Sequence, residues 1–211
     1  MKNAPTPYQN AIRLLYILVS GAEKLEQGSS IEADGLFKGE TKLHAMDFWV
    51  RYPDYLAYEL INIFESTQDT SCLISAEAIF NSHEPDLRRI PMIRYRWGAY
   101  DRIDDTLSIL IAKGLVHQDG TRGKAGIQES HFFIMPSAYA LADRITREFP
   151  ILEWYKERAD LVAKVAGSRG GTALKAQQYK HIAYASTSGG QIIKPITDEV
   201  QLKLRQLRSQ V

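Results

Sequence analysis

Hydrophobic residues recur at three- and four-residue steps in several stretches of the chain, and this spacing predicts a mainly helical protein. The first stretch covers residues 9–26 and stops at Gly28. A second begins near Thr41 and ends before Pro53, because proline disfavours helix in the residue before it but is tolerated in a first helical turn. Residues 31–40 contain two glycines and are expected to form a loop. Further helices are predicted over residues 54–64, 76–80, 99–113, 136–147, 151–166, 173–184 and 196–208.

The most specific pattern lies between residues 99 and 135. Apolar residues recur through 99–113, and Gly114 stands where a helix C-cap is expected. Two short predicted strands, 115–117 and 131–135, flank a polar, glycine-rich stretch. This order of elements is typical of a winged helix: a helix with a glycine-capped end, a strand, a turn, a second strand and another helix. The phrase LIAKGLV, residues 110–116, is its most specific part.

We therefore expect a mainly α fold with a small β wing. Residues 1–150 are predicted to hold N-terminal helices and a winged-helix domain, with the wing at about 115–135. Residues 151–211 are predicted to form a C-terminal helical arm, with a glycine-rich linker at residues 167–171.

Composition fits a globular protein with a real core, since 45% of the residues are hydrophobic and 24% are charged. The net charge is +1, so the whole chain is not a polycation that would bind nucleic acid by charge alone. The distribution is uneven: residues 1–150 hold 16 Lys and Arg against 20 Asp and Glu, and residues 151–211 hold 10 against 5. The basic arm could contact nucleic acid, contact an acidic protein, or present a solvated helix face.

The single cysteine, Cys72, excludes an internal disulfide and a thiolate zinc cluster. The apolar stretch at residues 12–19 is interrupted by Arg13 and Tyr16 and lacks the small-residue cleavage site of a signal peptide. No run approaches the roughly 20 apolar residues of a membrane-spanning helix. These features predict a cytoplasmic protein.

The predicted helix before the wing is where a helix-turn-helix protein reads DNA. Its start carries Asp101, Asp104 and Asp105 and only one cation, Arg102. Three carboxylates would be pushed towards the phosphates, whereas DNA affinity depends on cations that displace counterions. The aspartates do suit the positive end of the helix dipole, which explains why they are tolerated. The surface is therefore predicted to be a poor DNA reader.

A cluster of arginines and aromatic residues precedes this helix. Because Trp, Tyr and Arg are enriched in protein-interface hot spots, a protein contact is favoured over stacking on nucleic-acid bases, although Trp97 could also be a core residue. DNA contacts, if any, are expected from Arg88, Arg89, Arg122 and Lys124. The residues expected to bind a protein partner are Arg94, Tyr95, Arg96, Trp97, Tyr100, Asp101, Asp104 and Asp105.

The sequence offers no assembled catalytic chemistry. His44 and Asp47 could bind a metal ion from one helix face, but no third ligand lies nearby in the sequence. Cys72 has no base close to it in sequence, and the glycines of residues 167–171 lack the strand and the Lys-Ser/Thr of a phosphate loop. We expect no catalytic residue, no metal site and no cofactor, hence a protein that is not an enzyme.

Two stretches together resemble a known group of proteins. KLHAMDFWVRYPDYLA covers residues 42–57, and PMIRYRWGAY, residues 91–100, leads into DDTLSIL at residues 104–110. They resemble the middle components of bacterial three-component ABC-ATPase systems, the Lamassu-type anti-phage and anti-plasmid defence group. The resemblance covers residues 40–145.

The resemblance implies a small winged-helix adaptor that binds an SMC/Rad50-like ABC ATPase and helps couple it to an effector, such as a nuclease. ATP would be held by the ATPase subunit and nucleic acid cleaved by the effector, so the resemblance assigns no catalytic residue to this chain. DNA contact within such a complex is compatible with it, and no membrane partner is implied. The alternative that the residues leave open is a winged-helix DNA-binding transcriptional regulator.

Overall fold

The computed structural model describes residues 5–25, 31–95, 98–123 and 126–209. Within these residues 64% of the protein is helical, and a small antiparallel sheet of four strands accompanies the helices. The expected mainly α fold with a small β element is therefore confirmed. Packing divides the chain into two compact units that interleave in sequence. Unit 1 comprises residues 1–47 and 101–175, and unit 2 comprises residues 48–100 and 176–211. The division at residue 150 expected from the sequence stays a prediction.

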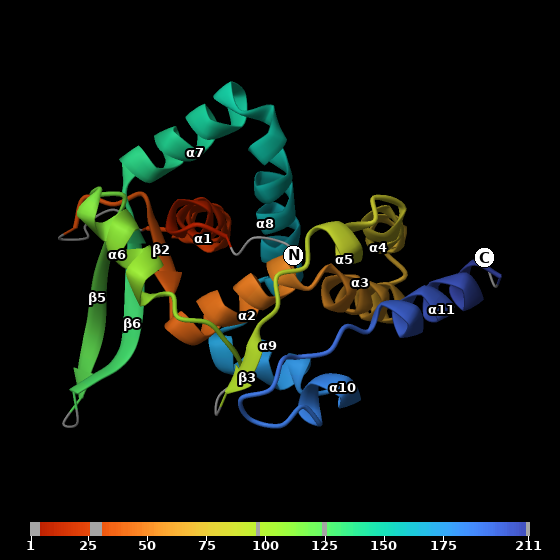
Figure 1. The fold of residues 1–211 in the computed structure, drawn as a ribbon. Helices are drawn as coiled ribbons and strands as arrows, with labels where there is room; N and C mark the ends of the chain where they lie inside the picture. Colours follow the sequence, from red (N-terminus) through yellow and green to blue (C-terminus); the bar gives the residue numbers. More distant parts are fainter. Residues whose placement is uncertain (1–4, 26–30, 96–97, 124–125, 210–211) are drawn as a thin grey trace. The chain divides into compact units, whose positions relative to one another are not determined.

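Unit 1 contains the four-stranded sheet and the helices around α1 (Figure 1). Its elements are α1 (Pro7–Gly21), β1 (Glu23–Lys24), β2 (Gly35–Lys38), the first part of α2 (Glu40–Arg51), α6 (Asp104–Ala112), β5 (Val116–Gly123), β6 (Gly126–Ile134), α7 (Pro136–Glu148), the 3-10 turn η1 (Pro150–Leu152), α8 (Glu153–Ala166) and the start of α9 (Gly171–Gln178).

Helix α1 forms the centre of unit 1. Thr6 and Gln9 form a capping box at its start, in which each side chain accepts a hydrogen bond from the other residue's backbone N–H. Leu14 and Ile17 are completely buried, and α1 contacts α6, α7, α8, β2 and β6. Figure 1 shows α1 end-on, with α6 and the sheet on one side and α8 on the other. A helix surrounded in this way is apolar on most of its faces.

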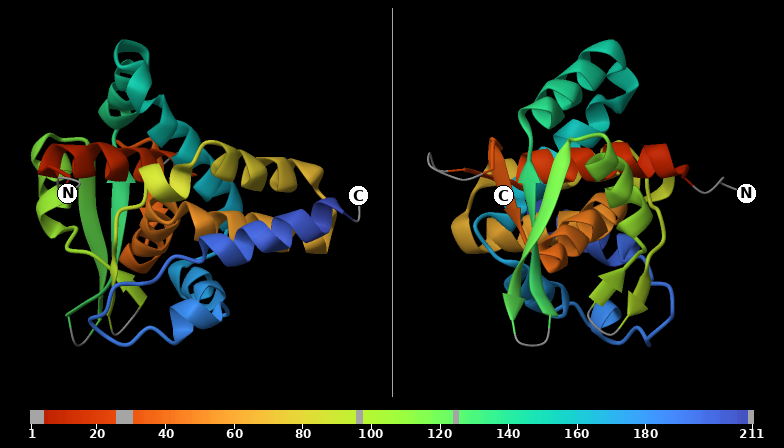
Figure 2. Two further views of the ribbon diagram at one scale, coloured as in Figure 1. Left: turned by 45° about the vertical axis from the view of Figure 1, so that its right-hand side comes forward. Right: turned by 90° about the vertical axis from the view of Figure 1, so that its left-hand side faces the viewer.

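The sheet has the strand order β1-β2-β6-β5, and all its pairs are antiparallel. Phe37 of β2 lies opposite Phe132 of β6, and both rings are completely buried. The expected loop over residues 31–40 is therefore wrong in part, because β2 occupies Gly35–Lys38. The hairpin strands β5 and β6 extend through the stretch that was expected to be a polar turn, and the right-hand view of Figure 2 shows them as one long hairpin.

The end of α6 confirms the predicted glycine cap. Gly114 has φ +65°, in the left-handed region that favours glycine. Its N–H donates to the carbonyl of Ile111, and the Leu115 N–H donates to the carbonyl of Leu110. These bonds satisfy carbonyls that would otherwise lack a helical partner and turn the chain directly into β5.

Unit 2 is helical apart from a two-stranded sheet. Its α3, α4 and α11 lie side by side, as the left-hand view of Figure 2 shows. Its elements are the last part of α2, α3 (Pro53–Thr67), α4 (Thr70–Asn81), α5 (Glu84–Leu87), β3 (Ile93–Tyr95), β4 (Gly98–Tyr100), the last part of α9, α10 (Ile182–Ala185) and α11 (Thr197–Arg208).

Aromatic rings fill the interior of unit 2. Phe48 stacks on Tyr52 with ring centroids 4.7 Å apart and meets the edges of Tyr55 and Tyr184 at 4.9 and 5.2 Å. The hydroxyl of Tyr52 accepts from the Met92 N–H at 3.0 Å and donates to the Ile193 carbonyl at 2.9 Å. Buried hydroxyls need such partners, so the rings also fix the course of the C-terminal segment.

Candidate partner-binding surfaces

The exposed face of α6 is acidic at its start and apolar at its end. Asp104 and Asp105 are exposed in the first turn, and Ser108, Ile111 and Ala112 continue the exposed face. The opposite face is buried in unit 1 through Thr106, Leu107 and Leu110. Helix α6 contains no Lys or Arg, so its outer face offers no cation to a phosphate.

The residues just before α6 do not change this charge. The carboxylate of Asp101 accepts a hydrogen bond from the Arg102 N–H at 2.8 Å, which fixes the turn that enters the helix. The first helical turn has no side-chain cap, and the two carboxylates at its start interact favourably with the helix dipole instead. The predicted group of Asp101, Asp104 and Asp105 is thus held together at one end of α6 in unit 1.

The arginine and aromatic cluster lies mostly in unit 2, and the side chain of Arg94 is used within that unit. Its guanidinium donates to the Thr187 carbonyl at 2.7 Å and to the Tyr179 hydroxyl at 3.1 Å, and it lies over the Tyr179 ring. Tyr95 is half exposed and packs against Tyr100, with ring centroids 5.5 Å apart. Arg94 therefore holds residues 179 and 187 within unit 2, whereas the predicted role of Tyr95 in binding a partner stays a prediction.

The other predicted contact residues are only partly described. Arg88 and Arg89 are partly exposed in unit 2. The backbone of Arg122 pairs with Ile127 in the β5–β6 hairpin, but its side chain lies outside the described part of the protein. Arg96, Trp97 and Lys124 also lie outside the described residues. Their predicted roles stay predictions.

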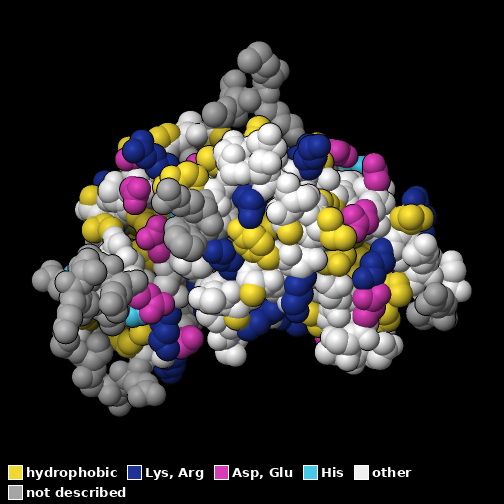
Figure 3. Space-filling model, turned by 90° about the horizontal axis from the view of Figure 1, so that it is seen from below, with side chains coloured by type: hydrophobic (Ala, Val, Ile, Leu, Met, Phe, Trp, Pro, Cys, Tyr) yellow, Lys and Arg dark blue, Asp and Glu magenta, His cyan; other side chains and the backbone are white. Residues whose placement is uncertain are grey.

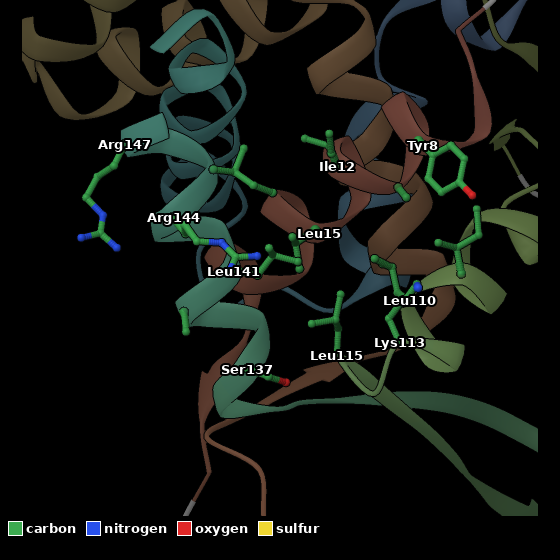
Figure 4. A pocket seen from close by; sticks show the side chains of 14 residues that line it. Tyr8, Ile12, Leu15, Leu110, Lys113, Leu115, Ser137, Leu141, Arg144 and Arg147 are labelled. Carbon is green, nitrogen blue, oxygen red and sulfur yellow. The ribbon is translucent and has the colours of Figure 1, made fainter. Parts of the chain in front are cut away.

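An apolar groove in unit 1 is a surface that the sequence did not reveal. Its cavity volume is about 730 Å³, and Figure 4 shows its walls. Helix α1 contributes Ile12 and Leu15, and α7 contributes Leu141. The pattern of α7 could have pointed to it, because Ala140, Leu141, Arg144 and Ile145 share one helix face that no intramolecular partner covers completely. The remaining lining residues are Tyr8, Ala11, Ile109, Leu110, Lys113, Leu115, Ser137 and Arg147.

His44 and Asp47, which the sequence offered as a possible metal-binding pair, interact with other side chains instead. Asp47 is completely buried, and its carboxylate accepts from the Arg13 guanidinium at 2.6 Å. His44 lies 3.4 Å from the Glu40 carboxylate, and the hydrogen bond from His44 lowers the pKa of Glu40. Across the described ranges, no group of three or more His, Cys, Asp or Glu side chains could hold a metal ion.

Burial shifts the pKa values of several other groups, and their partners are structural. Burial raises the pKa of Asp54, whose carboxylate accepts from the Ile196 N–H at 2.7 Å and the Thr197 hydroxyl at 3.2 Å at the start of α11. Burial also lowers the pKa of Lys42, whose ammonium donates to the Gly21 carbonyl at the end of α1. Both groups bind backbone atoms at helix ends, and Lys42 also lines a cavity of about 310 Å³ in unit 1.

The face shown in Figure 3 carries Lys and Arg side chains interspersed with Asp and Glu. Among the described residues, no helix combines the length and apolar character needed to cross a membrane. Comparison with known proteins finds no matching family model, no matching curated protein and no matching solved structure.

Proposed function

We propose that this protein is a non-catalytic winged-helix adaptor. It would bind an SMC/Rad50-like ATPase and help couple that ATPase to an effector nuclease in prokaryotic antiviral or anti-plasmid defence. The observation that carries the proposal is the exposed face of α6, where Asp104 and Asp105 stand in the position that a DNA reader fills with cations.

The order and pairing of elements in unit 1 support the winged-helix part of the proposal. In a winged helix, the recognition helix leads directly into a two-stranded wing, and the first strand of the domain pairs with the second strand of the wing. Here α6 leads into the β5–β6 hairpin, and β2 pairs with β6. Helices α1 and α2 would then be the first two helices of the domain, and residues 48–100 would be an insertion before the recognition helix.

Charge supports a protein partner for this surface. Carboxylates facing a phosphate backbone reduce affinity, whereas they suit a basic patch on another protein. The exposed Ser108, Ile111 and Ala112 continue the same face with small and apolar groups, which fits the apolar centre of a protein interface.

The experiment is co-expression of the chain with the proteins encoded beside it, followed by affinity purification. The test variant is Asp104→Lys/Asp105→Lys, and the control is Glu32→Lys/Glu157→Lys, which makes the same charge change at two exposed positions outside α6. We expect the test variant to lose the ATPase and the control to retain it. Purification of the wild-type chain alone, with no ATPase gene beside it, would refute the proposal.

The same two variants test the alternative of a DNA-binding regulator. If α6 lies against DNA, replacing two carboxylates with ammonium groups must raise the affinity for DNA and steepen its dependence on salt. A mobility-shift titration across a salt series measures both. An adaptor that does not use α6 on DNA shows no such gain.

A further inference from the structure

The groove in unit 1 has an apolar floor between two walls. Leu15 of α1, Leu110 of α6 and Leu115 form its buried base, and Leu141 and Ile145 of α7 are partly exposed along one wall. The groove is partly open to solvent. Exposed aliphatic side chains gathered in a concave surface mark a binding site more often than the same residues scattered singly.

Cations stand on both walls of the groove. Lys113 follows α6 on one side, and Arg144 comes from α7 on the other, with its guanidinium extending towards Leu15 (Figure 4). Arg147 lies further along α7 and points away from the groove. The lining contains no Asp or Glu, and within the described residues none of the three cations has a carboxylate partner.

This arrangement defines the chemistry of the occupant. A small anionic amphiphile, such as a fatty acid, has one charged end and would satisfy one wall only. An amphipathic helix inserts an apolar stripe and can carry carboxylates along both sides of it. The opposed Lys113 and Arg144 therefore fit a helix whose apolar stripe has acidic residues on either side.

We infer that the groove between α1, α6 and α7 binds an acidic amphipathic helix of a partner protein. Leucine-type side chains of that helix, spaced at three and four residues, cover the apolar floor, and its flanking carboxylates meet Arg144 and Lys113. The inference adds a second surface to the proposed adaptor role. Its test uses peptides and no ATPase, so either proposal can fail alone.

The experiment selects binders for the full-length protein from a displayed library of helical peptides of about 18 residues, a length that permits helix formation. Every peptide carries a fixed apolar stripe, and the flanking positions vary between Glu, Gln and Lys. Binding is then measured by fluorescence with a dye on Ala140→Cys in the groove, after protecting or replacing the buried Cys72, which is the only other cysteine.

We expect the selected peptides to carry Glu at the flanking positions. Arg144→Glu should weaken their binding by about tenfold or more, which corresponds to about 1.4 kcal/mol. Arg147→Glu should have a smaller effect because its side chain points away from the groove. The control Arg102→Glu makes the same charge change at an exposed position outside the lining and should leave the affinity unchanged.

A charge exchange makes the test specific. With Lys113→Glu/Arg144→Glu as bait, the same library should yield peptides with Lys at the flanking positions. The inference is overturned if no peptide is selected, if Gln or Lys is selected by the wild-type protein, or if Arg144→Glu leaves binding unchanged. If the dye reports binding of dodecanoate in the groove but of no peptide, the groove is a small-molecule site instead. A concentration-dependent dimer that excludes the peptides would identify a second copy as the occupant.

Discussion

Units 1 and 2 differ in what holds their interiors together. In unit 2, tyrosine rings fill the interior and their hydroxyls bind the unit's own backbone, as Tyr52 does with Met92 and Ile193. In unit 1, one helix is surrounded on several sides, but an apolar groove and an acidic helix face remain open to other molecules. The two binding surfaces that we propose both lie in unit 1, although unit 2 also exposes large apolar side chains such as Ile74, Tyr95 and Ile182.

The largest expected effect tests the interior of unit 2. Tyr52→Ala removes a buried ring and both hydroxyl contacts, and should lower the free energy of unfolding by about 3–5 kcal/mol. Tyr52→Phe keeps the ring but leaves the Met92 N–H without its acceptor, and should cost about 1–3 kcal/mol. Urea titration with hydrogen exchange assigned to residues 48–100 measures both. Equal losses in the two variants would show that the hydroxyl, and not the ring, makes the main contribution of Tyr52 to the free energy of unfolding.

A comparable loss is expected in unit 1 from its buried ion pair. Arg13→Leu leaves the carboxylate of Asp47 buried without its guanidinium, which should cost about 3–5 kcal/mol. The double variant Arg13→Leu/Asp47→Leu removes both charges and should recover much of that stability. Urea titration of the three proteins gives the comparison. A double variant as unstable as the single one would mean that apolar side chains cannot replace this ion pair. The stability of unit 1 would then depend on specific polar contacts as closely as that of unit 2 does.

A smaller effect is expected at the turn from α6 into the hairpin. Gly114→Ala places a side chain at φ +65°, which should cost about 1–2 kcal/mol. A Cβ at this position would meet no atom of another residue within 4 Å beyond its chain neighbours, so the cost comes from the local backbone and not from a clash with another element. Gly114→Asn should lose less, because asparagine enters the left-handed region more readily. Thermal or urea unfolding ranks the stability of the wild type and the two variants. Equal stability of the wild type and Gly114→Ala would contradict the role of Gly114 as a helix cap.

The smallest expected effect depends on pH and concerns unit 2. Burial raises the pKa of Asp54 above 3.8, so the folded state holds the proton more tightly than the unfolded chain. This contribution to stability is present below 3.8 and is lost as pH rises through the raised pKa of the folded state. Asp54→Asn does not titrate. Its stability relative to the wild type should therefore increase with pH over this window.

Amide exchange in α11 measures that difference, because Asp54 binds the start of this helix. A difference that decreases as pH rises would show that the ionised carboxylate is the stabilising form. In that case, unit 2 would depend on a buried charge, as unit 1 does at Arg13 and Asp47.

Local signals predicted the cap and the approximate positions of the helices, whereas pairings between distant segments could not be read from the chain. The predicted helices 9–26 and 99–113 were too long, because β1 occupies Glu23–Lys24 and β4 occupies Gly98–Tyr100. Gly114 and the phrase before it identified the end of α6, because helix termination is a local event. The strand β2 was missed because its partner, β6, lies about a hundred residues away. The hairpin was predicted too short because exposed polar residues such as Gln118 and Asp119 leave no alternating pattern.

The candidate surfaces were predicted where they depend on local sequence and missed where they depend on contacts between distant segments. The exposure of Asp104 and Asp105 followed from helix periodicity alone. The engagement of Arg94 with Thr187 and Tyr179 depends on residues more than eighty positions away, so its sequence neighbours suggested a free surface. Predicting the groove requires the relative positions of α1, α6 and α7, because no single stretch of sequence contains all of its lining residues.

The interleaving of the two units bears on how the chain is made. Domains generally fold as units during synthesis, from the N-terminus onwards. Here residues 48–100 leave the ribosome before unit 1 is complete, and they wait for residues 176–211 before their own unit can close. The Met92 carbonyl therefore lacks the Ile193 N–H, and the Ala99 N–H lacks the Tyr184 hydroxyl, until residues 184 and 193 have been synthesised. A ribosome that stops near residue 175 would release a chain with a complete unit 1 and an unfinished unit 2, a species for chaperones and proteases to recognise.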